Sequence, residues 1–472
     1  MKTYQDLLEC GDYENRRIDF IYEAINDHES SYEYEIGHKA GLFYRHRDPN
    51  IESYQKIIYD IQGKAHVDEI SPNHKLMSNF YANLIDQAIQ YLLGNGISFE
   101  NEGIKDELSN QLDHRIKRIA EYAAIDGSAY GLIDVQDGKR ELIPLCFACQ
   151  IDGNEPLFIP LKDERTGKLM AGIRYWRLSD SKPLMATLYE TDGYTEYQEY
   201  AYDDESKPRL TVTQEKRPYI VDSVSNAAQG VYIANGRNYD RLPIIEMGYI
   251  NNQSSLIGNE PTITAYNMVL SGFVNQVDWN LLYWIINNAD GMSQVDDINF
   301  LADIIKTHVL HTSGEATAQP YEVTIQHEAR SELLDRLRTQ LYEDMGGVDV
   351  SKNSANMTAT EIKSAYAALN RKCDKIESYI DDFIADTLEI LGYEGEVWHY
   401  QRDVTINQSE AVQNIIASAP WLGEEMTTRA LLEVQGKIDE FEKLQAQKIA
   451  DDYKAFNSNE NSPTSENEGE GE

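Results

Sequence analysis

A single long amphipathic helix, expected over residues 358–391, constrains this chain more than any other stretch. Its apolar residues recur in steps that alternate mostly between four and three: Ile362, Tyr366, Leu369, Cys373, Ile376, Ile380, Phe383, Thr387 and Leu391. That spacing puts a narrow apolar stripe on one face of the helix, and at about 1.5 Å per residue the helix would be roughly 50 Å long. Because globular helices average about 11–12 residues, a rod of this length favours a large assembly over a compact monomer.

The start of this helix is marked by Thr358 and Glu361, whose spacing is that of a capping box. Shortly before it lies a small, polar, glycine-bearing loop from Gly346 to Asn356. The hydrogen-bonding groups and the one positive charge of this loop come from Asp349, Ser351, Lys352, Asn353, Ser354 and Asn356. We expect this loop to carry function. The alternative is an ordinary surface loop with a solvated lysine.

The balance of charge limits the partners of the chain. Among 472 residues, 80 are acidic and 42 are basic, which gives a formal net charge of −38. A surface of that charge repels phosphates, and this excludes a general DNA-gripping surface. Acidity keeps many proteins soluble, and it would also give a surface that DNA passes without sticking. Composition does not separate these two interpretations.

Helices are expected first and strands after them, a pattern that predicts the α+β class. Residues 1–70 have a helical, polar pattern, Ser71 and Pro72 would begin a helix that ends at Gly94, and a further helix would cover 104–124. From 128 to 250 the period changes to two, with turn signals between short β-rich runs. The candidate strands are 129–135, 140–147, 157–161, 172–178, 184–190, 195–202, 209–213 and 217–222.

The second half of the chain mixes long helices with a small insert. The expected elements are a strand at 242–246, a helix at 261–288, a short helix at 296–306, strands at 307–311 and 321–326, a helix at 329–344, a strand at 397–406, and helices at 408–417 and 426–455. The tail from Ser458 to Glu472 is acidic and lacks apolar residues, so it is predicted to be disordered.

The order of these elements resembles that of the portal proteins of tailed bacteriophages, in the branch of long, non-contractile-tailed phages of Gram-positive hosts. The matching pieces cover most of the chain and are HKLMSNFYANLIDQAIQYLLGNGISFE, AIDGSAYGLIDVQDGKRELIPL, LPIIEMGYINNQSSLIGNEPTITAYNMVLSGFVNQVDWN, the polar loop with TATEIKSAYAALNRKCDKIE, and YQRDVTINQSEAVQNIIA. No piece is a signature by itself, and their order and spacing carry the resemblance. Many relatives have Ser-Gly just before the long helix, where this chain has Met357-Thr358-Ala359-Thr360.

The resemblance implies a ring, usually of twelve subunits, around a central channel for DNA. On this sequence its parts would be a wing at 1–250, a stem helix at 251–290, a clip at 291–328, a stem return helix at 329–344, a tunnel loop at 345–357, a long wing helix and strand at 358–407, crown helices at 408–457 and a disordered acidic tail at 458–472. The tunnel loop would bring Lys352 of every subunit to the DNA, and such phosphate contacts carry no base information. In the clip, His308, His311 and Glu315 would meet a partner protein.

The resemblance also implies a location and partners. The protein would be synthesised in the cytoplasm of a bacterial host and would lie at the portal vertex of the capsid. Its partners would be other copies of itself, double-stranded DNA, the terminase large subunit, a head-completion or adaptor protein, and the major capsid and scaffolding proteins. The terminase would supply the ATP-driven work, so neither enzymatic activity nor a cofactor is expected. The sequence has no apolar run of about 18 residues, and no membrane is expected as a partner.

Catalytic and metal-binding motifs offer little support for other functions. The chain has no Gly-x-x-x-x-Gly-Lys-Ser/Thr, Gly-x-Ser-x-Gly or His-Glu-x-x-His motif. Cys146 and Cys149 have the spacing of half a zinc site, but no second pair of ligands is spaced to complete it. We expect these two thiols to lie in the core, with a metal-dependent enzyme as one alternative. A second alternative is an acidic assembly scaffold or interaction module without a channel.

Overall fold

The structure is a computed structural model. It describes residues 1–59, 63–69, 71–101, 103–108, 111–136, 139–179, 181–200, 208–227, 231–278, 282–287, 317–322, 327–349, 351, 364–400, 402, 408–434, 441, 444–445 and 448. The chain divides into two compact units, of which the first comprises Met1–Asp349 and Ala368–Arg402 and the second comprises Val350–Ala367 and Asp403–Glu472. The mixture of helices and sheets confirms the predicted α+β class.

The described helices are distributed along the whole chain. They are α1 (Tyr4–Cys10), α2 (Glu14–Glu29), α3 (Tyr32–Tyr44), α4 (Pro49–Glu52), α5 (Phe80–Leu93), α6 (Gly103–Glu107), α7 (Leu112–Asp126), the 3-10 helix η1 (Ile250–Asn252), α8 (Glu260–Asp278), α10 (His327–Asp344), α12 (Ala367–Leu391) and α13 (Gln408–Val434). The predicted helix over 104–124 is divided into α6 and α7, and α7 ends at Asp126, with Gly127 in a left-handed conformation just after it.

The strands lie mostly in the middle of the chain. They are β1 (Ile57–Tyr59), β2 (Ala65–Val67), β3 (Ile97–Phe99), β4 (Ser128–Gln136), β5 (Lys139–Leu145), β6 (Leu157–Lys162), β7 (Leu169–Trp176), β8 (Met185–Glu190), β9 (Gly193–Tyr200), β10 (Arg209–Arg217), β11 (Ile220–Ala227), β12 (Val231–Arg237), β13 (Ile244–Gly248), β14 (Leu282–Asn287), β15 (Thr317–Glu322) and β16 (Trp398–Tyr400). All eight strands predicted between 128 and 222 are confirmed within a few residues, whereas the hairpin β1–β2 and strands β3 and β12 were missed.

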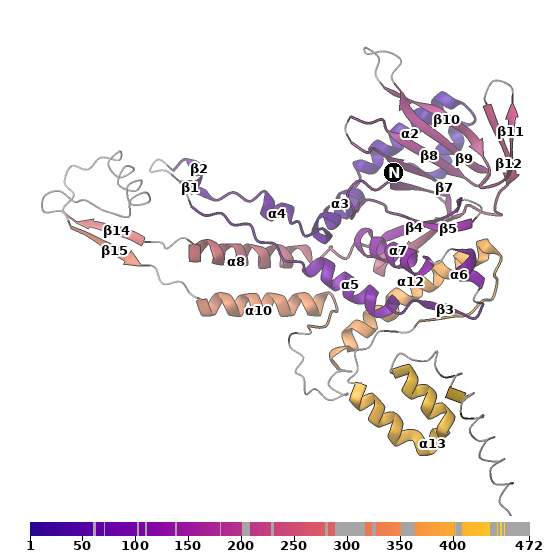
Figure 1. Cartoon of the computed structure of the whole chain (residues 1–472). Coiled ribbons are helices and arrows are strands. Elements are labelled where there is room, and N and C mark those ends of the chain that lie inside the picture. The colour runs from indigo at the N-terminus through magenta and orange to yellow at the C-terminus, as the bar shows by residue number, and fades with distance from the viewer. Residues whose placement is uncertain are drawn as a thin grey trace, which may run out of the picture. The chain divides into compact units, whose positions relative to one another are not determined.

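Two antiparallel sheets form the body of the first unit. One has five strands in the order β10-β9-β8-β7-β6, and the other has three in the order β13-β4-β5. Helix α2 lies across one face of the larger sheet, in contact with β8 and β10 (Figure 1). Helix α12 packs on β4, where Gly131 leaves room for the ring of Phe383 and where an added Cβ would come within 2.7 Å of that ring.

Helix α12 confirms most of the predicted apolar stripe. Its buried side chains are Leu369, Cys373, Ile376, Ile380, Phe383, Ile384, Thr387 and Leu388. The described helix begins at Ala367, after a turn at Tyr366, and the capping box of Thr358 and Glu361 lies outside the described residues.

Residues 71–79, which we call the strap, correct a prediction. The sequence predicts a helix from Ser71, but the strap is extended and α5 begins at Phe80. Alternate backbone N–H groups of the strap donate to side chains of α8: His74 N to Asn275 Oδ1 at 2.6 Å, Leu76 N to Ser271 Oγ at 2.9 Å and Ser78 N to Asn267 Oδ1 at 2.8 Å. These partners replace the hydrogen bonds that a helix would have supplied.

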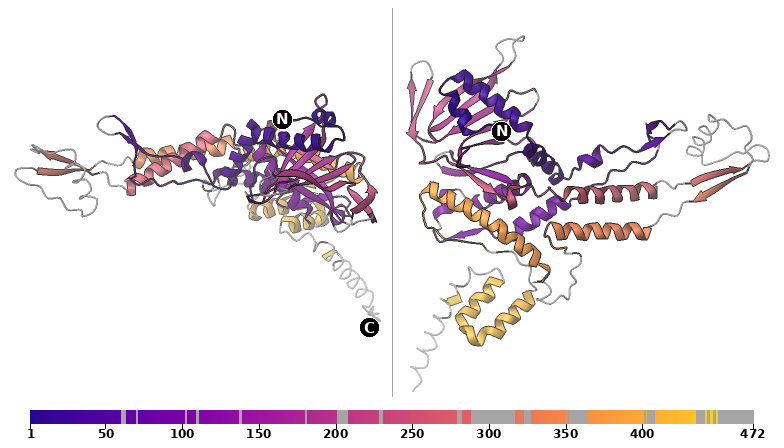
Figure 2. Two further views of the ribbon diagram at one scale, coloured as in Figure 1. Left: turned by 90° about the horizontal axis from the view of Figure 1, so that it is seen from above. Right: turned by 180° about the vertical axis from the view of Figure 1, so that it is seen from behind.

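Helices α8 and α10 lie side by side and extend away from the sheets (Figure 1, Figure 2). The prediction of one helix from 261 to 288 is wrong at its end, because α8 stops at Asp278 and residues 282–287 pair with β15. The run from Tyr283 to Ile286 is aromatic and β-branched, and such residues favour a strand. In the second unit, α13 contains Pro420 and a break at Gly423, which confirms a division between two helical segments there.

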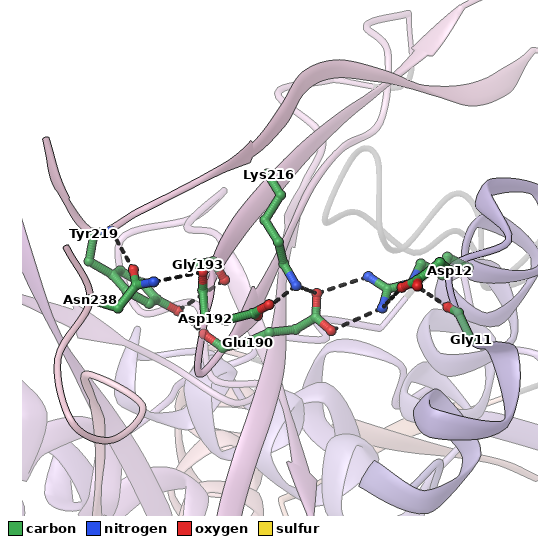
Figure 3. Close-up of polar contacts among 9 residues, drawn as sticks. Gly11, Asp12, Glu190, Asp192, Gly193, Lys216, Tyr219 and Asn238 are labelled. Carbon is green, nitrogen blue, oxygen red and sulfur yellow. Dashed lines mark hydrogen bonds and ion pairs between the residues drawn. The ribbon is translucent and has the colours of Figure 1, made fainter. Parts of the chain in front are cut away.

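A polar network joins the N-terminal helices to the larger sheet (Figure 3). Arg17 of α2 makes two hydrogen bonds to Glu190 at 2.9 and 3.1 Å and a third to the carbonyl of Gly11 at 2.8 Å. The carboxylate of Glu190 also forms an ion pair with Lys216, whose Nζ lies 2.9 Å from Oε2 of Glu190. The side chains of Arg17 and Glu190 are only 17% and 13% exposed, so water screens this pair little.

Replacement of Arg17 by Leu should destabilise the first unit. The change leaves the shielded carboxylate of Glu190 with Lys216 alone, and we expect a loss of about 2 kcal/mol in a chemical denaturation experiment. The matched control is Arg209→Leu, because Arg209 joins Asp19 of the same helix to the same sheet with side chains 51% and 64% exposed. That control should cost less than about 1 kcal/mol, and equal losses for both variants would contradict the assigned role of the network.

Candidate functional site

Residues 345–349, which we call the loop root, connect α10 to the predicted functional loop. Gly346 has a φ of 64°, a left-handed conformation that glycine adopts without strain and that ends α10. The N–H of Gly347 then donates to the carbonyl of Tyr342 at 2.8 Å. Met345 and Val348 are buried, so the loop root belongs to the core of the first unit.

The side chain of Gln87 on α5 holds the loop root from one side. Its Nε2 donates to the carbonyl of Val348 at 2.9 Å, and its Oε1 accepts the N–H of Val348 at 2.8 Å. The same surface of α5 packs closely on Gly347, where an added Cβ would lie 2.2 Å from Cδ2 of Leu84. The side-chain amide of Gln87 thus bonds both the N–H and the carbonyl of the buried Val348. The preceding residue, Gly347, has no room for a side chain.

An ion pair to α10 fixes the last residue of the loop root. The carboxylate of Asp349 accepts two hydrogen bonds from the guanidinium of Arg338, at 3.0 and 2.9 Å. The side chain of Asp349 is only 7% exposed, and the hydrogen bond to it raises the pKa of Arg338. Arg338 also lies over the ring of Tyr342, 5.7 Å from its centroid. The negative charge of Asp349 is therefore neutralised within the first unit.

Lys372 on α12 provides the third attachment. Its Nζ donates to the carbonyl of Met345 at 2.9 Å, just past the C-terminal end of α10, where the helix dipole favours a cation. Burial lowers the pKa of Lys372 to about 8. One residue further along α12, the thiol of Cys373 donates to the carbonyl of Ala88 on α5 at 3.6 Å. Three helices, α5, α10 and α12, thus converge on the loop root.

The predicted site residues are described only in part. Asp349 lies in the loop root, and Ser351 is exposed and belongs to the second unit. The other predicted loop residues, Lys352, Asn353, Ser354 and Asn356, and the predicted clip residues, His308, His311 and Glu315, lie outside the described residues. Contact with DNA or with a partner stays a prediction for these residues.

The structure adds three positioning residues that sequence reasoning missed: Gln87, Arg338 and Lys372. Gln87 is 261 residues from Val348, so no local pattern points to their pairing. The sequence could have indicated Arg338, because it lies near the end of the predicted helix 329–344 and only 11 residues before Asp349. Lys372 lies next to the apolar stripe of α12, a place where sequence alone suggests an ordinary solvated lysine.

The cysteine pair occupies a tightly bonded turn after β5. Asp126 Oδ2 accepts the N–H groups of Phe147 and Ala148 at 3.0 Å each and that of Cys149 at 3.3 Å. Cys146 and Cys149 are free and buried, and burial raises the pKa of Cys149. Within the described part of the chain, no group of three or more His, Cys, Asp or Glu residues is arranged to hold a metal ion. Among the described helices, none is long and apolar enough to span a bilayer.

Comparison with known proteins identifies a family. The family model described as phage portal protein, SPP1 Gp6-like, matches residues 42–454. No curated protein matches the chain. The neck of a native GTA particle computed with C12 symmetry is 11% identical over 74% of this chain and 87% of that chain, with a TM-score of 0.36. The neck of an empty GTA particle computed with C6 symmetry is 10% identical over 75% and 90%, with a TM-score of 0.38. Scores this low carry no conclusion about this chain.

Replacement of Gly347 by Ala should loosen the loop root. The new methyl group would collide with Leu84 and Gln87, and overpacking of this kind costs about 1–3 kcal/mol. We expect faster amide hydrogen exchange at Val348 and a lower melting temperature. Gly272→Ala in α8 is the control, since an added Cβ there meets nothing within 4 Å. Unchanged exchange at Val348 in Gly347→Ala would show that the loop root is not closely packed.

Proposed function

We propose, since this chain belongs to the SPP1 Gp6-like family of phage portal proteins, that its copies form a ring around a DNA channel at one vertex of a phage capsid. The family match over residues 42–454 carries the proposal. The ring would have twelve subunits and would serve genome packaging, retention and ejection. It would dock the terminase large subunit and a head-completion or adaptor protein, beside the major capsid and scaffolding proteins.

The loop root supports the mechanical part of this proposal. A loop that touches moving DNA needs a fixed attachment, since a loose one would follow the DNA instead of positioning it. Gln87, Arg338 and Lys372 supply that attachment from three helices. Because Asp349 is already paired, its charge adds little repulsion, and Lys352 is left as the charged residue proposed to meet phosphates.

The net negative charge of the chain supports a channel through which DNA moves without binding tightly to the wall. A net charge of −38 makes most of the surface repulsive to DNA, so a duplex would not bind along a wall of this composition. Contacts confined to one loop per subunit would be phosphate contacts, which do not depend on base sequence. The energy for movement would come from the terminase, a separate protein. The branch of phages that the sequence resembles stays a prediction.

Purified protein should assemble into a ring with a central hole. Mass measurement and class averages viewed along the ring axis test this directly, and the mass gives the number of subunits. A stable monomer at a concentration on the order of 1 μM in moderate salt would count against the proposal, since obligate assemblies persist at such concentrations. Particles without a hole would favour the alternative, an acidic assembly scaffold.

Replacement of Lys352 by Glu should reduce packaged DNA while rings still assemble. The substitution puts repulsion where attraction is proposed, so each subunit would oppose the duplex instead of contacting it. Packaged DNA per capsid is the measurement, and Lys352→Arg, which keeps the charge, is the control that should package normally. Normal packaging by the Lys352→Glu variant would remove the loop from its proposed role.

A further inference from the structure

A cavity of about 520 Å³ lies behind the loop root, between three segments of the first unit. One wall is the polar loop 249–259, a second is the C-terminal end of α10, and the third is the face of α12 that carries Arg371, Lys372 and Lys375. We call it the basic cavity. The three cations and Ala368 follow helical spacing, so they share one face of α12 beside its buried stripe.

Two of these cations are available to a ligand. Lys372 is bound to the carbonyl of Met345, whereas Arg371 and Lys375 are exposed and lie one helical turn apart. Within the described residues, no carboxylate lies within ion-pair distance of either. Other arginines that contact α12 are paired: Arg241 with Asp386 and Glu389, and Arg402 with Asp374 and Glu377. Two unpaired cations in one cavity stand out in a chain with 80 acidic residues.

The opposite wall is polar and is attached to the body of the first unit. Asn251, which lines the cavity, and Asn252 have φ values of 58° and 51°, so the chain makes a left-handed turn in this wall. Behind it, Ser255 fixes the loop to α7, because its N–H and its Oγ both donate to the carbonyl of Ala124, at 3.0 and 2.7 Å. The basic cavity is therefore already formed in a single chain, so little binding free energy would be lost in ordering it around a ligand.

We infer that the basic cavity receives an acidic side chain from a second copy of this chain, bound by Arg371 and Lys375. The inference rests on the proposed ring. A ring needs head-to-tail contacts, in which each copy offers one surface to its neighbour on one side and a different surface on the other. A chain of net charge −38 presents carboxylates over much of its surface, so a neighbour supplies the ligand that the cavity lacks.

A DNA duplex fits the same cavity less well. A duplex carries one negative charge per about 1.7 Å, so a backbone crossing the cavity would also pass Glu343 and Asp344 on the α10 wall. The C-terminal end of α10 adds the negative partial charge of its helix dipole. A single carboxylate carries one charge, so the α10 wall repels it less than it repels a duplex, and Arg371 and Lys375 outweigh that one charge. Proteins that bind duplexes use broad positive surfaces instead.

A carbodiimide cross-linking experiment on assembled rings tests the inference. The reagent activates a carboxylate, and a lysine amine in contact with it displaces the activated group to form an amide, with release of a urea. In rings assembled from nitrogen-15-labelled and unlabelled chains, we expect a mixed-isotope peptide pair that contains Lys375 and an acidic residue of another copy. Lys375→Arg keeps the charge but has no amine to couple, so in that variant rings should form and this peptide pair should vanish.

The double variant Arg371→Ala, Lys375→Ala measures the contribution of the contact to assembly. We expect its rings to dissociate at about half the salt concentration that wild-type rings withstand, since the remaining contacts are unchanged. Coupling of Lys375 only within its own chain, or rings of unchanged salt resistance, would overturn the inference. Loss of duplex binding in fluorescence anisotropy, with assembly unchanged, would overturn it in favour of DNA. Absence of rings from wild-type protein would instead contradict the proposed function.

Discussion

The fold of the first unit depends on the hydrogen bonds between the strap and α8. Alternate N–H groups of an extended segment meet side chains one turn apart on a helix, and the two repeats, about 6.8 and 6.0 Å, are close enough to match over the two steps that separate the three bonds. This match buries Asn267 and Ser271, the most shielded positions of α8 besides Ile263. Because the strap leads directly into α5, the same contacts set where α5 begins and where it lies.

The position of α5 in turn determines the loop root. Gln87 and Leu84 hold the backbone after α10, while Arg338 and Lys372 attach it to the two helices beside it. Four interactions of different kinds act on the five residues of the loop root, so the start of the loop that we propose to be functional is held by contacts within a single chain.

Many cationic side chains of this protein form ion pairs with carboxylates of the same chain. Among the described residues, several shielded cations have a carboxylate close by, as in the network of Arg17 with Glu190 and the pair of Arg338 with Asp349. His28 avoids charge altogether, since burial lowers its pKa to about 3 and its Nδ1 lies 3.0 Å from the hydroxyl of Tyr175. Arg371 and Lys375 differ from these groups, because among the described residues neither of them forms an ion pair, although both line the basic cavity.

The sequence by itself determined the class of the fold, the strands of the sheets and the buried stripe of α12, because period-two and helical patterns are local consequences of which face is buried. It also pointed to the loop before that helix as a functional loop, which stays a prediction. Tertiary structure alone decided that residues 71–79 are extended and that Gln87, Arg338 and Lys372 hold the loop root. The physical reason is that a backbone N–H bonds to whichever acceptor packing brings near, and the acceptor for Leu76 lies 195 residues away on α8.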